Sequence, residues 1–232
     1  MGVLTVISGV IALLCSLLGA VAVDFNLDAF SDPKLILTMQ GVHVALIRWS
    51  MVADLFGYYL LLLPAIFYLH DWMKGRTPWR NLLTFCGSSY VLIGAIGASI
   101  LAAVWPPLML AFPGATAGQQ ENLQMSFNMF SDLVYRGMWN RLEVFLGGIW
   151  WLGVGAFLRK ESKVLGIVTI VLGIFTILDG IGAVMGVSAL SELGLNVYLI
   201  LAPLWALWFG VALMRGDSRL MVKMTIEALR NC

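Results

Sequence analysis

The chain has 232 residues, of which 60% are hydrophobic and only 12% carry a charge, and its mean hydropathy is +0.91. So few charges exclude a water-soluble globule of this length, and the apolar residues form runs long enough to cross a bilayer. A net charge of +1 and the lack of an arginine-rich stripe argue against nucleic acid as a partner. The composition therefore predicts an all-α, multi-pass membrane protein whose surroundings are the lipid bilayer.

Six apolar stretches predict a bundle of six transmembrane helices in a single transmembrane domain, residues 1–232. The first stretch lacks a preceding Lys or Arg and is longer than the apolar part of a signal peptide, so we interpret it as a retained anchor. The third is expected to stop at Trp105, where Pro106 and Pro107 follow. The six spans are expected at residues 3–23, 51–73, 82–104, 139–158, 164–188 and 195–214.

Two long connections, residues 24–50 and 105–138, are expected on the outer face. Gly41 is expected to break the first connection, which leaves a short helix on the outer interface before the second span. Within the second connection, an amphipathic helix is predicted over residues 118–137, which either lies flat on the membrane or caps the bundle. Whether it forms a lid is left open. Its apolar face consists of Leu123, Phe127, Phe130 and Val134.

The cations predict the orientation of the bundle. With six spans, the loop 73–81, the turn 159–163 and the tail 215–232 fall on one side and hold ten of the fourteen Lys and Arg residues. The positive-inside rule makes that side cytoplasmic, so both termini are expected inside the cell.

The fifth span carries small residues on one side at alternating spacings of three and four. Such a stripe lets helix backbones approach closely in lipid, where apolar helices have no hydrophobic drive to associate. Asp179 lies beside the stripe, and an ionisable group at such a depth is expected to face protein or water and to have a partner. The stripe consists of Gly166, Thr169, Gly173, Thr176, Gly180 and Ala183.

Counting residues from the cytoplasmic cations brings three acidic side chains to one depth. At 1.5 Å per residue, Asp54 lies roughly 30 Å from the inner face, and Glu143 and Asp179 roughly 24 Å. Arg141 is expected to pair with Glu143 or Asp179 in a buried network. The alternatives are that this network only holds helices together, or that the charges reach water at the outer boundary. The candidate ligand-binding residues are Asp54, Tyr58, Asn140, Arg141, Glu143 and Asp179.

The two histidines raise the possibility of a tetrapyrrole cofactor. His43 and His70 are 27 residues apart, or roughly 40 Å along a helix, so they cannot ligate one haem in a monomer. Each alone is a possible single axial ligand, but a histidine at a helix end is more often an interfacial hydrogen-bonding residue. The chain has no metal-ligand spacing and no catalytic motif. We therefore expect no cofactor, no metal and no catalytic residue.

The hairpin from Phe145 to Gly180 carries the run Gly-Gly-Ile-Trp-Trp-Leu-Gly, a basic turn, and an ending at Leu178 and Asp179. In these features it resembles small six-span bacterial membrane proteins of unknown function. The resemblance covers the middle of the chain. It implies the bacterial inner (cytoplasmic) membrane and this number of helices, and it carries no active residues to transfer.

Three functions remain open at this point. The first is a non-enzymatic accessory or structural component, which uses its small-residue stripes to pack in a membrane complex or as a small oligomer. The second is a binder or transporter of a small molecule or ion, with an outward-facing polar pocket. The third is a membrane enzyme that modifies a lipid or quinone, with a carboxylate as its general base.

Overall fold

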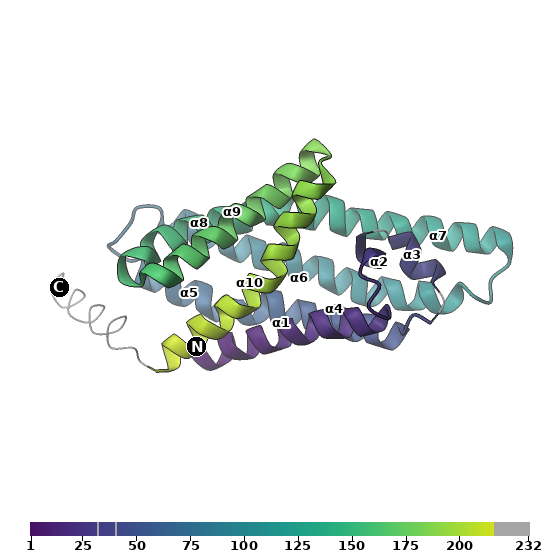
Figure 1. The fold of residues 1–232 in the computed structure, drawn as a ribbon, viewed down its shortest axis with the longest axis horizontal. Coiled ribbons are helices and arrows are strands. Elements are labelled where there is room, and N and C mark those ends of the chain that lie inside the picture. Colours follow the sequence, from purple (N-terminus) through teal and green to yellow (C-terminus); the bar gives the residue numbers. More distant parts are fainter. Residues whose placement is uncertain (32, 40, 216–232) are drawn as a thin grey trace.

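The computed structural model describes residues 1–31, 33–39 and 41–215, and within these residues every regular element is a helix (Figure 1). Six helices are long and apolar enough to cross a membrane, which confirms the predicted all-α architecture with six spans. The predicted cytoplasmic tail lies outside the described part from residue 216 onward. The six spans are Gly2–Ala22, Val44–Trp72, Arg80–Ala111, Ala117–Glu161, Lys163–Met185 and Ser188–Met214.

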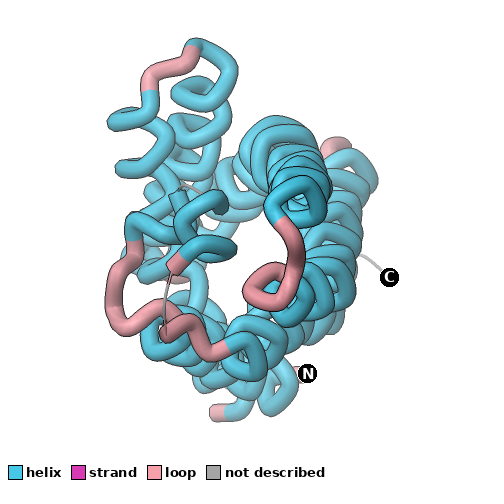
Figure 2. Tube along the Cα trace, turned by 90° about the vertical axis from the view of Figure 1, so that its right-hand side faces the viewer, coloured by secondary structure: helices cyan, strands magenta, loops and turns pink. Residues whose placement is uncertain are grey.

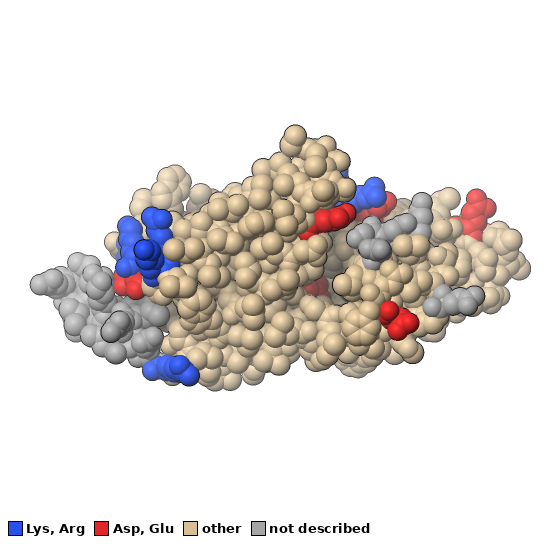
Figure 3. All heavy atoms as spheres, viewed as in Figure 1, with Lys and Arg blue, Asp and Glu red and all other residues tan. Residues whose placement is uncertain are grey.

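The molecule is elongated, and four chain segments meet at one of its ends. These segments are the N-terminus of α1 (Gly2–Ala22), residues 73–79, the turn between α8 (Val144–Glu161) and α9 (Lys163–Met185), and the end of α10 (Ser188–Met214) (Figure 1). We call this the basic end, because Lys and Arg gather there, whereas Asp and Glu predominate toward the opposite end (Figure 3). The start of α1 and the end of α10 lie at the same end of the molecule, as expected for a chain that crosses the membrane an even number of times (Figure 1).

The second span is a broken helix. It consists of α4 (Val44–Asp54), the π-helical η1 (Leu55–Tyr59), the 3₁₀ segment η2 (Leu60–Leu62) and α5 (Leu63–Trp72).

Pro64 in the first turn of α5 accounts for the break. It has no N–H to donate to the Leu60 carbonyl, and its ring would clash with that carbonyl in a continuous α-helix. In the wider π-helical turn that precedes it, residues four and five positions apart share one face. The neighbours Tyr58 and Tyr59 are consequently both buried, on the side of Asp54.

The third span is α6 (Arg80–Ala111). The prediction that this helix stops at Trp105 is wrong, because the helix continues through Pro106 and Pro107. Packing against α7 (Ala117–Asp132) holds the extra turn. The Trp105 ring stacks on Phe127 at 5.1 Å and on Tyr135 at 6.0 Å between centroids. Its indole N–H donates to the Ser131 hydroxyl at 2.9 Å. Tertiary contacts therefore override the local helix-breaking signal.

The amphipathic segment expected at residues 118–137 is not a separate helix. It runs through α7 and the π-helical η3 (Leu133–Glu143) into α8 without a break, so the helix that contains the fourth span starts at Ala117. This helix of 45 residues is roughly 67 Å long at 1.5 Å per residue, about twice the hydrocarbon thickness. Its α7 half must therefore extend beyond the bilayer.

The outer segments cover the far part of this long helix. The helices α2 (Asp28–Ser31) and α3 (Pro33–Thr38) end before Gly41, whose φ of +81° breaks the chain as predicted. Ile36 and Leu37 join Trp105 and Phe127 in one buried apolar cluster. Viewed from the far end, the turn between α9 and α10 stands above the other helices (Figure 2).

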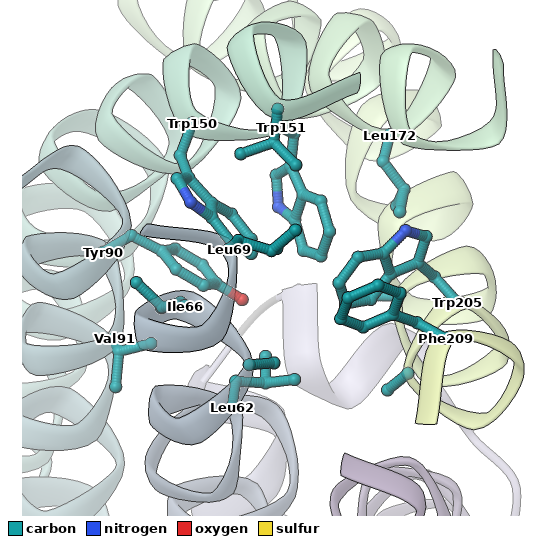
Figure 4. Close-up of a cluster of buried hydrophobic side chains, with 14 of the residues drawn as sticks. Leu62, Ile66, Leu69, Tyr90, Val91, Trp150, Trp151, Leu172, Trp205 and Phe209 are labelled. Carbon is teal, nitrogen blue, oxygen red and sulfur yellow. The ribbon is translucent and has the colours of Figure 1, made fainter. Parts of the chain in front are cut away.

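The core nearer the basic end is aromatic. Trp151 lies between Trp150 and Trp205, at centroid distances of 4.4 and 4.7 Å, and Phe209 stacks on Trp205 at 4.7 Å (Figure 4). The Trp205 indole N–H donates to the Thr169 hydroxyl at 2.8 Å. All four rings are at most 1% exposed, so this part of the bundle is dry.

The small-residue stripe of α9 packs inside the chain. Gly166, Thr169, Gly173 and Thr176 are all buried. A Cβ added at Gly173 would lie 2.7 Å from the backbone nitrogen of Leu152, so α8 and α9 touch along their backbones. The stripe therefore forms a contact between helices of one chain.

A similar close approach joins α1 to η1, and it generates a first prediction. A Cβ at Gly57 would lie 2.4 Å from the backbone nitrogen of Ala12. We expect Gly57→Ala to destabilise the protein by about 2 kcal/mol, which corresponds to a fall in Tm of roughly 4 to 8 °C. Heating detergent-solubilised protein followed by size-exclusion chromatography measures the shift. Gly118→Ala is the matched control, because Gly118 is helical with open space around it. An equal Tm for both variants would contradict the prediction.

A second prediction concerns sidedness. With the three native cysteines replaced by Ser, we expect Gly118→Cys to react with a membrane-impermeant maleimide in intact bacterial cells, and Pro78→Cys to react only after lysis. The physical reason is the positive-inside rule, which places the basic end in the cytoplasm. Labelling of Pro78→Cys in intact cells would reverse the orientation.

Candidate functional site

The three acidic side chains that were predicted at one depth all face protein. Asp54 is 9% exposed, Glu143 4% and Asp179 3%. Asp54 lies 18 residues before the end of α5, and Glu143 lies 18 residues before the end of α8. At 1.5 Å per residue both are roughly 27 Å from the basic end, near the far boundary of the hydrocarbon region.

Glu143 is held by a tyrosine from another helix. The Tyr59 hydroxyl lies 3.1 and 3.2 Å from the two carboxyl oxygens of Glu143, within donating distance of both. Glu143 is the last residue of η3, and Tyr59 is the last residue of η1. The contact therefore joins the two π-helical segments of the described chain. Such segments are frequent at functional sites.

Further tyrosines continue from this contact toward the aromatic core. The Tyr59 and Tyr90 ring centroids are 5.8 Å apart, and the hydroxyls of Tyr90 and Tyr198 share a short hydrogen bond. Tyr58 donates its hydroxyl to the Leu199 carbonyl at 2.9 Å. These four tyrosines come from η1, α6 and α10, and each is at most 8% exposed. We call Asp54, Glu143 and the four tyrosines the acid–tyrosine cluster.

Asp54 contributes an unused acceptor to this cluster. It is the last residue of α4 and directly precedes η1. Its Oδ2 atom is buried and has no hydrogen-bond partner among the described residues. Buried polar atoms are almost always paired, so an unpaired carboxyl oxygen is a marked exception.

Asp179 belongs to a second group of polar contacts. The Ser191 hydroxyl donates to Oδ1 of Asp179, and the Asn140 side-chain amide lies 3.5 Å from the Ser191 oxygen. Gly194 permits this arrangement, because a Cβ there would lie 2.6 Å from the backbone nitrogen of Asp179. The segment η3 thus connects both groups, through Asn140 and Glu143.

The predicted pairing of Arg141 with these acids is wrong. Arg141 is exposed, and none of the ion pairs between described residues involves it or the three acids. Residues two positions apart do not share a helix face, so a buried Glu143 directs Arg141 outward. The three carboxyl groups therefore have no cationic partner in the described chain.

Neither histidine lies in the cluster. His43 caps the start of α4 and is exposed. His70 lies in the last turn of α5, where its Nδ1 is 2.8 Å from the Thr84 hydroxyl oxygen. They occupy opposite ends of the second span, as the residue count predicted.

Four members of these groups were not among the predicted site residues, namely Tyr59, Tyr90, Tyr198 and Ser191. Tyr90 lies deeper than the acidic layer, and Ser191 lies near the start of α10. These residues could have been found from their polar side chains within apolar spans, because a buried tyrosine hydroxyl needs a hydrogen-bond partner.

No family model, curated protein or solved structure matches this chain. The resemblance to small bacterial membrane proteins is thus supported only in the number of spans.

A third prediction follows from the contact between Tyr59 and Glu143. We expect Tyr59→Phe to lower the free energy of unfolding by about 1 to 3 kcal/mol, because it leaves a buried carboxyl group without its donor. Thermal unfolding in detergent measures the loss. Tyr135→Phe is the control, since no hydrogen bond is found for that hydroxyl in the described structure. Glu143→Gln should be tolerated, because the amide oxygen still accepts from Tyr59. A Tyr59→Phe protein as stable as the wild type would contradict this.

Proposed function

We propose that this polytopic membrane protein binds protons at the acid–tyrosine cluster and carries them across the membrane. The observation that carries the proposal is the buried carboxyl group of Glu143, which accepts from the Tyr59 hydroxyl and, like Asp54 and Asp179, has no cationic partner among the described residues. Ionisable side chains inside a membrane are rare, and they mark ion pathways and proton relays.

Electrostatics favour a cationic ligand. An ionised carboxylate buried without a counter-charge costs several kcal/mol. A bound proton removes that charge and needs no cavity. A polyvalent metal is less suitable, because no three His, Cys, Asp or Glu side chains converge in the described residues. The proton is therefore the ligand that best fits a closely packed cluster.

The helix breaks support a moving part rather than a rigid brace. The second span changes from α to π to 3₁₀ helix within nine residues, directly beside Asp54. Transporters use such discontinuous helices at their binding sites, where unwound backbone can rearrange. Within the cluster, hydroxyl groups such as those of Tyr59 and Tyr90 can both donate and accept protons.

The other two functions have less support. The accessory role was inferred from small-residue stripes, but that of α9 packs against α8 of the same chain. For the lipid or quinone enzyme, a carboxylate base remains the only available chemistry. The distribution of cations supports an orientation with both termini in the cytoplasm. The bacterial inner membrane is what the resemblance to small bacterial membrane proteins implies.

The fourth prediction tests the carrier. In proteoliposomes that contain a pH-sensitive dye, an imposed pH gradient should decay faster with the wild-type protein than in empty vesicles. Glu143→Gln and Asp54→Asn should each remove at least about nine-tenths of this excess rate, because an amide cannot exchange a proton in this range. Asp71→Asn is the matched control, since Asp71 is exposed near the basic end.

Infrared difference spectroscopy supplies a second measurement on the same variants. A carboxyl band that changes with pH should be lost in Glu143→Gln and kept in Asp71→Asn. Equal proton flux in the wild type and in both cluster variants would overturn the proposal.

A further inference from the structure

A separate cavity lies at the basic end, away from the acid–tyrosine cluster. It has a volume of about 240 Å³ and is lined by residues from the ends of two spans. Trp72 ends α5, Lys160 and Glu161 end α8, and Arg76 follows in the connection to α6. The lining residues are Trp72, Arg76, Phe157, Lys160 and Glu161.

The charges around this cavity favour an anion. Arg76 forms an ion pair with Glu161 at 2.9 Å, and its guanidinium lies 4.9 Å from the centre of the Trp72 ring. Lys160 lies 5.5 Å from the centre of the Phe157 ring. Among the described lining residues, two cations and one acid leave a net positive charge. Lys160 is exposed, so its ammonium is available to a ligand.

A second observation points to a ligand with acceptor oxygens. Trp72 is 7% exposed, and its indole N–H is buried without a hydrogen-bond partner among the described residues. The indole N–H groups of Trp150 and Trp151 are also unpartnered, but only Trp72 of the three lines this cavity, so only its donor lies beside a space that a ligand could fill. Indole and ammonium donors beside an arginine are groups that bind phosphate oxygens.

The position of the cavity identifies the source of the phosphate. Both lining helices are candidate spans, and the cavity lies where they end. Lipid headgroups lie at this level of the bilayer, and tryptophan and basic residues anchor there. The rings of Trp72 and Phe157 give the cavity an apolar wall beside its charges.

We propose that this cavity binds the phosphate group of an anionic phospholipid from the adjoining leaflet. The phosphate accepts from Lys160 and Trp72, and the ion pair between Arg76 and Glu161 forms the side of the site. A lipid whose headgroup alcohol is uncharged, such as glycerol, carries only the one negative charge of its phosphate. That charge matches the single surplus positive charge of the described lining residues.

Binding to the delipidated full-length protein in detergent tests this assignment. The probes are phosphatidylglycerol, phosphatidylcholine with the same acyl chains, and inorganic phosphate, with affinity measured by native mass spectrometry or by the rise in Tm. Phosphatidylglycerol should bind more tightly than the other two probes. Lys160→Gln should weaken its binding roughly tenfold or more, the value of one hydrogen bond to a charged group.

Two further variants keep the test specific. Trp72→Phe keeps an aromatic ring beside Arg76 and removes the indole N–H, so it should weaken phosphatidylglycerol binding without loss of folding. Lys163→Gln removes a nearby exposed cation that does not line the cavity, and it should bind as the wild type does. Equal losses for Lys160→Gln and Lys163→Gln, or equal affinity for inorganic phosphate, would overturn the proposal.

Discussion

The hydrogen bond from Tyr59 to Glu143 is the contact on which the interior of this bundle depends. It joins the broken second span to the long fourth span, and it satisfies an acid that has no cationic partner in the part of the chain that the structure describes. Its origin lies in the sequence of η1 and η2. Pro64 cannot complete an α-helix, the preceding turns change to 3₁₀ and π geometry, and Tyr59 is directed inward beside Tyr58. One missing backbone N–H thus positions a buried tyrosine hydroxyl five residues earlier in the chain.

Hydrogen bonds from neighbouring helices satisfy the backbone of this irregular segment within the membrane. A break in a transmembrane helix leaves carbonyl groups that lipid cannot satisfy. Here the Ser8 hydroxyl of α1 donates to the Gly57 carbonyl at 2.5 Å, and the Tyr90 hydroxyl lies 3.4 Å from the Tyr58 carbonyl. The close approach at Gly57 brings Ser8 within reach. Small residues in α1 and η1 therefore stabilise the same irregularity that orients the tyrosines.

Periodicity and charge in the sequence were sufficient to predict the number of spans and the common depth of the acids, because both depend on local composition and on helix rise. Two errors arose from contacts between distant residues. The continuation of α6 past Pro106 depends on Trp105 packing against α7, and the π-helical turns depend on tertiary partners. The error at Arg141 was avoidable, since a residue two positions from a buried Glu143 faces away from it.

The dry aromatic core beneath the cluster limits what the cluster can do in the observed conformation. Below Tyr90, toward the basic end, the interior is filled by Trp150, Trp151, Leu158 and Leu165, each at most 1% exposed. Protons need water or polar groups to move, and this layer offers few. Exchange with the basic end therefore requires a rearrangement. The segment best suited to move is the one between Asp54 and Pro64, because its backbone already departs from α geometry and carries both an acid and its neighbouring tyrosines.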